Sequence, residues 1–189
     1  RVLFRSGVIT FNSAPDFEIS SDENSDNLYE INVTVTANGD TDKSPLEISV
    51  VNANETPSVA TLIPDQSTSQ DTLFSFSFAL NTFDDIDNGD TLTYSTTQDN
   101  DTPLPSWLSF TPATRTFSGT PLNTDVGTLS IKVIASDLLG TSISDTFDLV
   151  INNVNDAPTL NNPIENQTSD EDAAFSFTLP NDTFNDIDI

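Results

Sequence analysis

An internal repeat constrains the fold of this chain more than any other feature of its sequence. Asn54–Pro57 (NETP) recurs as Asn155–Pro158 (NDAP), and Phe83–Asp87 (FDDID) recurs as Phe184–Asp188 (FNDID), each offset by 101 residues. Solenoid units are shorter, about 20–45 residues, whereas a β-sandwich domain takes about 100. The 189-residue chain is therefore expected to contain consecutive β-sandwich domains joined by very short linkers.

Alternation of apolar and polar residues supports an all-β fold. A period of two places the apolar side chains on one face of a strand, and this period occurs over residues 29–35, 46–50, 74–78, 129–135 and 147–151. A further strand is expected at residues 91–95. Asn, Asp, Gly and Pro fill the gaps between the segments, as in turns. Helical periodicity of useful length is absent from the sequence.

Composition then narrows the function. The chain has no His and no Cys, which excludes a His general base, a Ser-His-Asp triad, a thiolate nucleophile and a zinc or iron–sulfur site. Its 30 acidic and 5 basic residues give a net charge of −25, which argues against nucleic acid and anionic membranes as partners. Two readings remain open: carboxylates that bind a hard cation such as Ca²⁺, or an acidic surface that serves only solubility.

The acidic residues fall into four groups: residues 16–18, the linker 52–57, residues 84–90 and Asp137. An Asp-x-Asp sequence is weak evidence for a metal site by itself, because Asp, Asn and Gly also form turns. An EF-hand is excluded, since position 12 of a loop beginning at Asp85 is Thr96 rather than a bidentate Glu.

Several motifs together resemble known domain families. The first set lies in residues 7–57 and consists of GVIT (7–10), PDFE (15–18), an alternating segment (29–37) and NETP (54–57). The second set lies in residues 57–156 and consists of FDDIDNGD (83–90), LPSWLSF (104–110), FSGTP (117–121) and VIASD (133–137). The first set resembles the C-terminal half of a cadherin domain. The second resembles a complete dystroglycan-type cadherin-like domain, a relative of the immunoglobulin-like repeats of bacterial surface proteins. The resemblance implies tandem immunoglobulin-like Greek-key β-sandwiches, end to end.

The resemblance also implies a Ca²⁺ site at the junction of the first two units. The matching residues come from the preceding unit, the linker and the following unit: Asp16, Glu18, Asn54, Glu55, Asp85, Asp87 and Asp137. A second, weaker site is implied at the next junction by Asp125, Asn155, Asp156, Asp186 and Asp188. The first linker has Asn where cadherins usually have Asp, so a reduced ligand set is expected.

The motifs divide the chain into four parts. Residues 1–6 match the translated tail of a common short-read sequencing adapter and are interpreted as foreign, the alternative being a genuine strand. Residues 7–56 are a C-terminal half-domain, residues 57–156 a complete domain, and residues 157–189 the N-terminal part of the next repeat. The two partial domains are expected to leave open sheet edges.

The predicted function is structural and not enzymatic: a Ca²⁺-stiffened repeat region of a large extracellular or cell-surface adhesion or stalk protein. The expected partners are neighbouring repeats of the same chain and cell-surface or matrix ligands, with no nucleic acid and no membrane insertion. The alternatives are an accessory module of a secreted polysaccharide-degrading enzyme, or a metal-free acidic spacer. A glycosidase is disfavoured because its acid and base must flank a cleft, which nothing in the sequence indicates.

Overall fold

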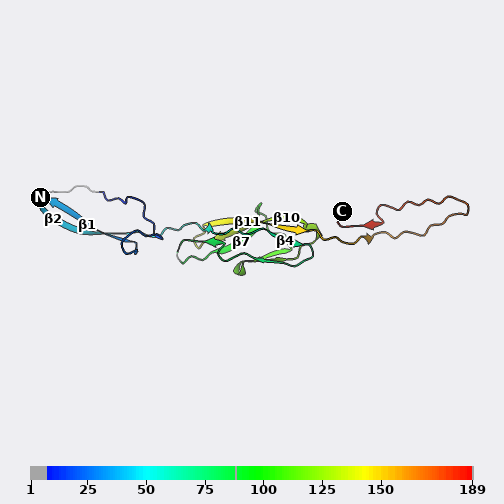
Figure 1. Cartoon of the computed structure of the whole chain (residues 1–189), viewed down its shortest axis with the longest axis horizontal. Coiled ribbons are helices and arrows are strands. Elements are labelled where there is room, and N and C mark those ends of the chain that lie inside the picture. Colours follow the sequence, from blue (N-terminus) through cyan, green and yellow to red (C-terminus); the bar gives the residue numbers. More distant parts are fainter. Residues whose placement is uncertain (1–7, 88, 189) are drawn as a thin grey trace.

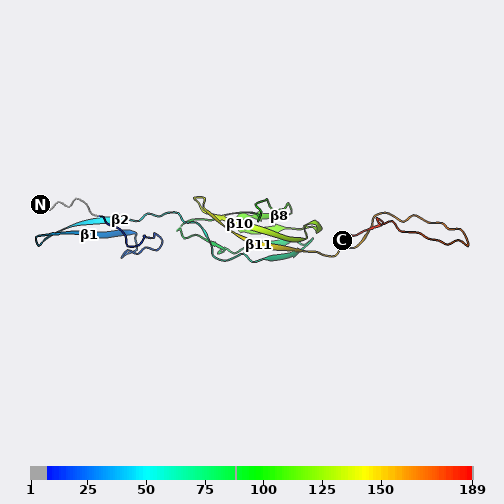
Figure 2. The same cartoon turned by 90° about the horizontal axis from the view of Figure 1, so that it is seen from above.

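A computed structural model describes residues 8–87 and 89–188, which form three parts arranged along one line (Figures 1 and 2). A β-hairpin lies at one end and a β-sandwich in the middle. At the other end, a long, largely irregular loop connects two short strands that pair with each other. The expectation that residues 1–6 are adapter-derived falls outside the described residues.

The described residues form thirteen strands and two 3₁₀ turns. The strands are β1 (Leu28–Ala37), β2 (Asp40–Ser49), β3 (Ser58–Val59), β4 (Gln66–Ser69), β5 (Phe74–Ser77), β6 (Phe83–Asp84), β7 (Thr93–Gln98), β8 (Leu108–Thr111), β9 (Thr116–Gly119), β10 (Gly127–Ser136), β11 (Ser142–Asn152), β12 (Thr159–Leu160) and β13 (Phe184–Asn185). The turns are η1 (Pro112–Thr114) and η2 (Asn123–Asp125).

The central part is a sandwich of two main sheets. One sheet has the order β4-β11-β10-β7 and the other the order β5-β9-β8. All pairings are antiparallel except that of β4 with β11, which is parallel. A separate short pair, β3 with β6, lies where the chain enters the domain. The all-β fold predicted from the alternating segments and the sandwich predicted from the length of the repeat are therefore confirmed.

Phenylalanine and β-branched side chains fill the space between the two sheets. Ile131, Val133 and Leu149 are completely buried from the four-stranded side, and Phe117 from the three-stranded side. The rings of Phe117 and Phe147 meet edge to face with centroids 5.5 Å apart, an arrangement favoured by their quadrupoles. Because β10 and β11 each present alternate residues inward, the sequence period of two translates directly into this core.

The N-terminal hairpin owes its register to one tight turn. Asn38 and Gly39, with φ of 54° and 93°, connect β1 directly to β2, as in the two-residue turns that match strand twist. The hairpin pairs Leu28 with Ser49 at its far end. Its apolar residues are only partly covered; Val33 and Leu46 keep more than a third of their surface exposed.

The C-terminal part repeats the local structure of the domain entrance. β12 pairs with β13 as β3 pairs with β6. The backbone N–H groups of Ala60 and Thr61 donate to the carbonyl of Thr82, and those of Asn161 and Asn162 donate to the carbonyl of Thr183. The 101-residue offset of the sequence motifs thus reappears as an offset of hydrogen bonds.

Trp107 packs against the edge of the core in a contact that only glycine permits. The side chain is partly buried beside the core cluster. A Cβ added at Gly119 would lie 1.9 Å from the carbonyl oxygen of Trp107. The FSGTP motif therefore contains glycine at this position because the two backbones approach so closely.

We predict that Gly119→Ala destabilises the central domain, because a backbone atom cannot yield as a flexible side chain can. The expected loss is at the upper end of the overpacking range, about 3 kcal/mol. Urea unfolding of the full chain, followed by fluorescence of Trp107 (the only tryptophan), measures it. Ser75→Ala, on the exposed face of β5, is the control, and equal midpoints for the two variants would contradict the packing argument.

Candidate metal centre

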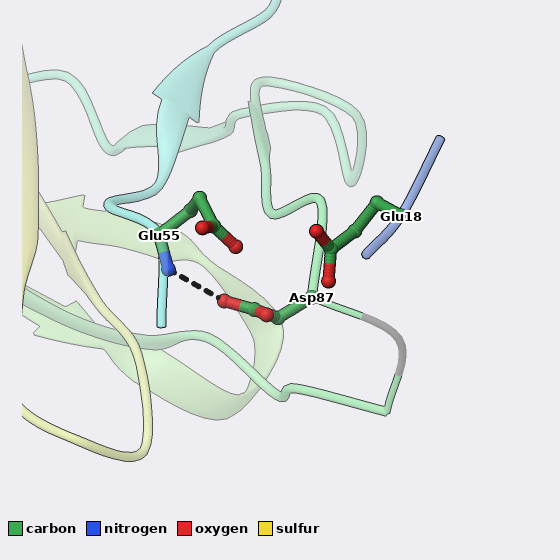
Figure 3. Close-up of side chains that lie close together, drawn as sticks. All are labelled: Glu18, Glu55 and Asp87. Atoms are coloured by element: carbon green, nitrogen blue, oxygen red, sulfur yellow. Dashed lines mark hydrogen bonds between the residues drawn. The ribbon is translucent and has the colours of Figure 1, made fainter. Parts of the chain in front are cut away.

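The pairing of β3 with β6 brings two distant acidic segments together. The linker residues 54–57 immediately precede β3, and the Asp-x-Asp loop immediately follows β6. Since Ser58 pairs with Asp84 in antiparallel register, the end of the linker lies beside residues 85–87. The loop before β1 supplies a third segment through Glu18, whose carboxylate points at that of Asp87 (Figure 3).

Two groups of carboxylates result, and they share one residue. Oxygen atoms of Glu18, Glu55 and Asp87 all lie within 4.8 Å of one another, and so do oxygen atoms of Asp85, Asp87 and Asp90. The first group joins three separate segments of the chain, whereas the second belongs to a single loop. We call the five residues the junction cluster.

Asp87 is the best-anchored member of the junction cluster. It is 7% exposed; its Oδ2 accepts the backbone N–H of Glu55 at 2.8 Å (Figure 3) and its Oδ1 accepts the amide of Asn52 at 2.8 Å. The backbone N–H of Asp87 in turn donates to Oδ1 of Asp85 at 3.0 Å. The hydrogen bonds from Glu55 and Asn52 lower the pKa of Asp87 despite the neighbouring charges.

Two other members of the junction cluster, Glu55 and Asp90, have raised pKa values because they are partly buried and crowded by other carboxylates. Burial, followed by the charges of Glu18 and Asp87, raises the pKa of Glu55. Burial, followed by the charges of Asp85 and Asp87, raises the pKa of Asp90. Among the described residues the only ion pair is Lys132 with Asp101, so no basic side chain described here neutralises the cluster.

The unpaired oxygens of the cluster fit a hard cation. One oxygen in each of four carboxylates is shielded from solvent and has no hydrogen-bond partner: Oε1 of Glu18, Oε2 of Glu55, Oδ2 of Asp85 and Oδ2 of Asp90. Buried polar atoms are normally paired, because leaving one unpaired costs free energy. Oxygen-only ligands at this density are the donor set of Ca²⁺, which the residues present could hold.

Asp137 and Asn54 have a different local role from the carboxylates of the cluster. Oδ1 of Asp137 accepts the backbone N–H groups of Leu139, Gly140 and Thr141 at 2.6–2.9 Å, which closes the turn between β10 and β11. Its Oδ2 accepts the hydroxyl of Thr141 and the amide of Asn54, the latter at 2.9 Å. These bonds, led by those of Thr141 and Asn54, lower the pKa of Asp137 to about 2.

The structure therefore brings together four of the seven residues expected at the first junction, Glu18, Glu55, Asp85 and Asp87. Asp137 and Asn54 anchor the linker beside them. Asp16 belongs to neither carboxylate group; its Oδ1 caps a turn by accepting the N–H groups of Glu18 and Ile19. The assignment of Ca²⁺ ligands stays a prediction.

The ligand set predicted from the sequence omits Asp90 and Asn52, although both lie within the acidic groups 84–90 and 52–57. Asp90 stands in the same acidic run, and its backbone N–H donates to the carbonyl of Asp87 at 3.2 Å, which folds the run back on itself. That turn was signalled by the Asn-Gly dipeptide at positions 88 and 89 of the sequence. Asn52 reaches Asp87 across 35 residues of sequence, and no local pattern indicates that contact.

The second junction repeats part of this geometry. The backbone N–H of Asp156 donates to Oδ2 of Asp188, that of Asp188 donates to Asp186, and the amide of Asn155 donates to the carbonyl of Asp156. Each bond has its counterpart 101 residues earlier. Asp125 instead accepts the N–H of Leu122 beside η2. Within residues 8–87 and 89–188, groups of three converging acidic side chains occur only at the first junction.

Comparison with known proteins identifies the family. The model of the family described as "Putative Ig domain" matches residues 56–152, which is the central sandwich with the end of the linker before it. The chain belongs to this family. The match confirms the immunoglobulin-like character expected from the motifs.

Solved structures agree on the fold. The extracellular cadherin domains 1–5 of protocadherin gamma B2 are 16% identical to this chain. The alignment covers 74% of this chain and 28% of the protocadherin chain, with a TM-score of 0.51. The extracellular domain of protocadherin gamma B4 is also 16% identical. That alignment covers 74% of this chain and 23% of the protocadherin chain, with a TM-score of 0.51. An endo-fucoidan hydrolase of glycoside hydrolase family 107 is 21% identical over 60% of this chain and 17% of its own, but its TM-score of 0.41 gives the match no weight for the fold. The chain thus spans less than a third of each of these structures.

Two further findings bear on the comparison. No curated protein matches the sequence. In the part of the chain that the structure describes, no helix has the length and apolar character needed to cross a membrane.

The hydrogen bonds of Asp137 generate a pH prediction. Because its pKa is lowered from 3.8 to about 2, the ionised side chain contributes stability that is present above pH 3.8 and is lost as the pH falls toward 2. We expect Asp137→Asn to lower the urea midpoint of the chain at pH 7 in a chelator, and the deficit to shrink between pH 4 and pH 2.

The control for this experiment is Asp99→Asn, which removes the same charge from an exposed site. A deficit for Asp137→Asn that stays constant from pH 7 to pH 2, or one matched by Asp99→Asn, would show that the carboxylate does not anchor the turn.

Proposed function

We propose that this chain is a calcium-binding, cadherin-like repeat region of a large extracellular adhesion or stalk protein, in which Ca²⁺ rigidifies the junction before the central domain. The observation that carries the proposal is the set of four buried, unpartnered carboxylate oxygens in the junction cluster. They belong to the loop before β1, the linker and the loop after β6, so one bound ion would contact both units and the linker between them.

Calcium suits the junction cluster better than other cations. The described ligand atoms are carboxylate oxygens from Glu18, Glu55, Asp85, Asp87 and Asp90, and the chain has no His or Cys to favour a transition metal. Ca²⁺ accepts six to eight oxygen ligands in an irregular geometry, whereas Mg²⁺ demands a near-ideal octahedron. A cluster drawn from three separate segments of the chain meets the first requirement more easily.

The bound ion would supply positive charge where the chain has none. Without it, carboxylates within 4.8 Å of one another repel, and the units can relieve that repulsion by moving apart. With it, the repulsion becomes attraction between the upstream loop and the central domain. Because binding favours only the assembled junction, its free energy adds to the stability of that arrangement.

A stiff junction points to a mechanical role rather than an enzymatic one. In this role the direct partners are the neighbouring repeats of the same chain, and cell-surface or matrix molecules are the external ligands. An extracellular location provides the millimolar Ca²⁺ that low-affinity oxygen sites require. The acidic surface outside the junction cluster then keeps the long array soluble.

The test is thermal unfolding of the full chain in calcium and in a chelator. At a free Ca²⁺ concentration of about 100 times Kd, binding should stabilise the junction by about 2.7 kcal/mol. For a domain of this size each kcal/mol raises Tm by roughly 4–8 °C, so a shift of about 10 °C or more is expected.

Asp85→Asn with Asp87→Asn should abolish the calcium shift. Asp170→Asn with Asp172→Asn is the matched control, because it removes two exposed charges at the same Asp-x-Asp spacing. If the wild-type Tm does not respond to calcium, or the 85/87 variant retains the shift, the acidic residues serve as a metal-free spacer and the proposal is wrong.

A further inference from the structure

Gln70 is a buried polar residue at the end of the central domain from which the chain continues into the second linker. It follows β4, is 1% exposed, and its backbone N–H donates to the carbonyl of Asn152 at 3.0 Å, at the end of β11. A glutamine buried to this extent is unusual, and neither the core nor the junction cluster accounts for it.

The side chain of Gln70 reaches into the outgoing linker. Its Nε2 donates to the carbonyl of Val154 at 3.2 Å and to Oδ2 of Asp156 at 3.1 Å. Asp156 also donates its backbone N–H to Asp188 in the next unit. A continuous path of hydrogen bonds therefore runs from the central domain through the linker to the loop after β13.

The corresponding linker residue at the first junction meets a different neighbour. Glu55 stands 101 residues before Asp156 and donates its backbone N–H to Asp87 in the same manner. Its carboxylate, however, faces the carboxylates of Glu18 and Asp87, and one of its oxygens has no partner. The upstream unit thus presents an anion to one linker carboxylate and a hydrogen-bond donor to the other.

We propose that Gln70 is a neutral amide latch that holds the second linker without a divalent cation, so that the two junctions of this chain differ in their need for calcium. The difference rests on the proposed function only for the first junction. At the second, an amide donor to a carboxylate is attractive by itself, and no convergent group of three acids opposes it within the described residues. Oε1 of Gln70 and Oδ1 of Asp188 are buried there without a partner, but only Asp188 of these two residues carries a charge, whereas all four unpartnered oxygens of the junction cluster belong to carboxylates. Chelation would therefore loosen one end of the central domain and leave the other fixed.

Amide hydrogen exchange in the ¹⁵N-labelled full chain tests the latch, because each linker has one reporting N–H group, that of Glu55 or that of Asp156. In EGTA relative to calcium chloride, we expect the Glu55 amide to exchange at least tenfold faster. The Asp156 amide should change less than twofold. A tenfold or greater response of Asp156 in the wild-type chain would overturn the latch.

The substitution Gln70→Ala separates the latch from the calcium proposal. Gln70→Ala should accelerate exchange of the Asp156 amide at least tenfold in EGTA, whether or not Glu55 responds to calcium; an unchanged rate would overturn the latch. If instead only the Glu55 amide fails to respond, the proposed function of the first junction is wrong while the latch stands.

Gln70→Glu places a carboxylate against Asp156 and should convert the second linker to the behaviour of the first, with fast exchange in EGTA that calcium slows at least tenfold. Ser67→Glu adds the same charge on the exposed face of β4 and should have no effect. An equal effect of both variants would show a general response to charge and contradict the latch. Trp107 fluorescence reports whether each variant retains the folded central domain.

Discussion

Mutual repulsion among carboxylates is the constraint on which the arrangement of this chain depends. Charges this close interact strongly wherever the surroundings are less polar than water, and a chain with 30 acidic residues and 5 basic ones has few cations with which to answer them. Asp87 shows how the fold copes. A backbone N–H and an asparagine amide stabilise its charge, while the pKa values of Glu55 and Asp90 rise around it. The ordinary hydrogen bonds are concentrated on Asp87, and each of the other four carboxylates of the junction cluster keeps one buried oxygen without a partner.

The β-sandwich fixes the positions of the acidic segments and so determines which carboxylates repel one another. Strands β10 and β11 lie in the interior of their sheet, and their inward residues are almost fully buried, so the turn that carries Asp137 is fixed by the core. The short pairing of β3 with β6 then fixes the linker beside the Asp-x-Asp loop. Two residues of strand on each side suffice because the aromatic core, through Phe83 and its contact with Phe78, holds β6 in place.

Sequence patterns predicted those parts of the structure that follow a local period. The alternating residues 129–135 and 147–151 lie within β10 and β11, whereas Phe78, the last residue of the alternation 74–78, is buried just beyond the end of β5. The strand expected at 91–95 begins at Thr93 and continues to Gln98, because its pairing with β10 rather than its own composition sets its length. Contacts such as that between Asn52 and Asp87 depend on tertiary placement and leave no periodic signal. The burial of Gln70 could not be predicted from the sequence either, because a single polar residue after a strand is ordinarily exposed to solvent.

The two junctions show which part of a linker is local and which is imposed from outside. The hydrogen bonds among Glu55, Asp85 and Asp87 recur among Asp156, Asp186 and Asp188, because both sets lie within the entrance of one unit and follow from the repeated motif. What differs is the side chain that the preceding unit contributes, Glu18 in one case and Gln70 in the other. The entrances of the central unit and of the next unit share these hydrogen bonds; under the two proposals, the side chain from the preceding unit decides whether the linker beside them is held by an ion or by an amide. Under those proposals, changing one residue per unit would vary the stiffness of successive junctions without altering the repeated motif or the core.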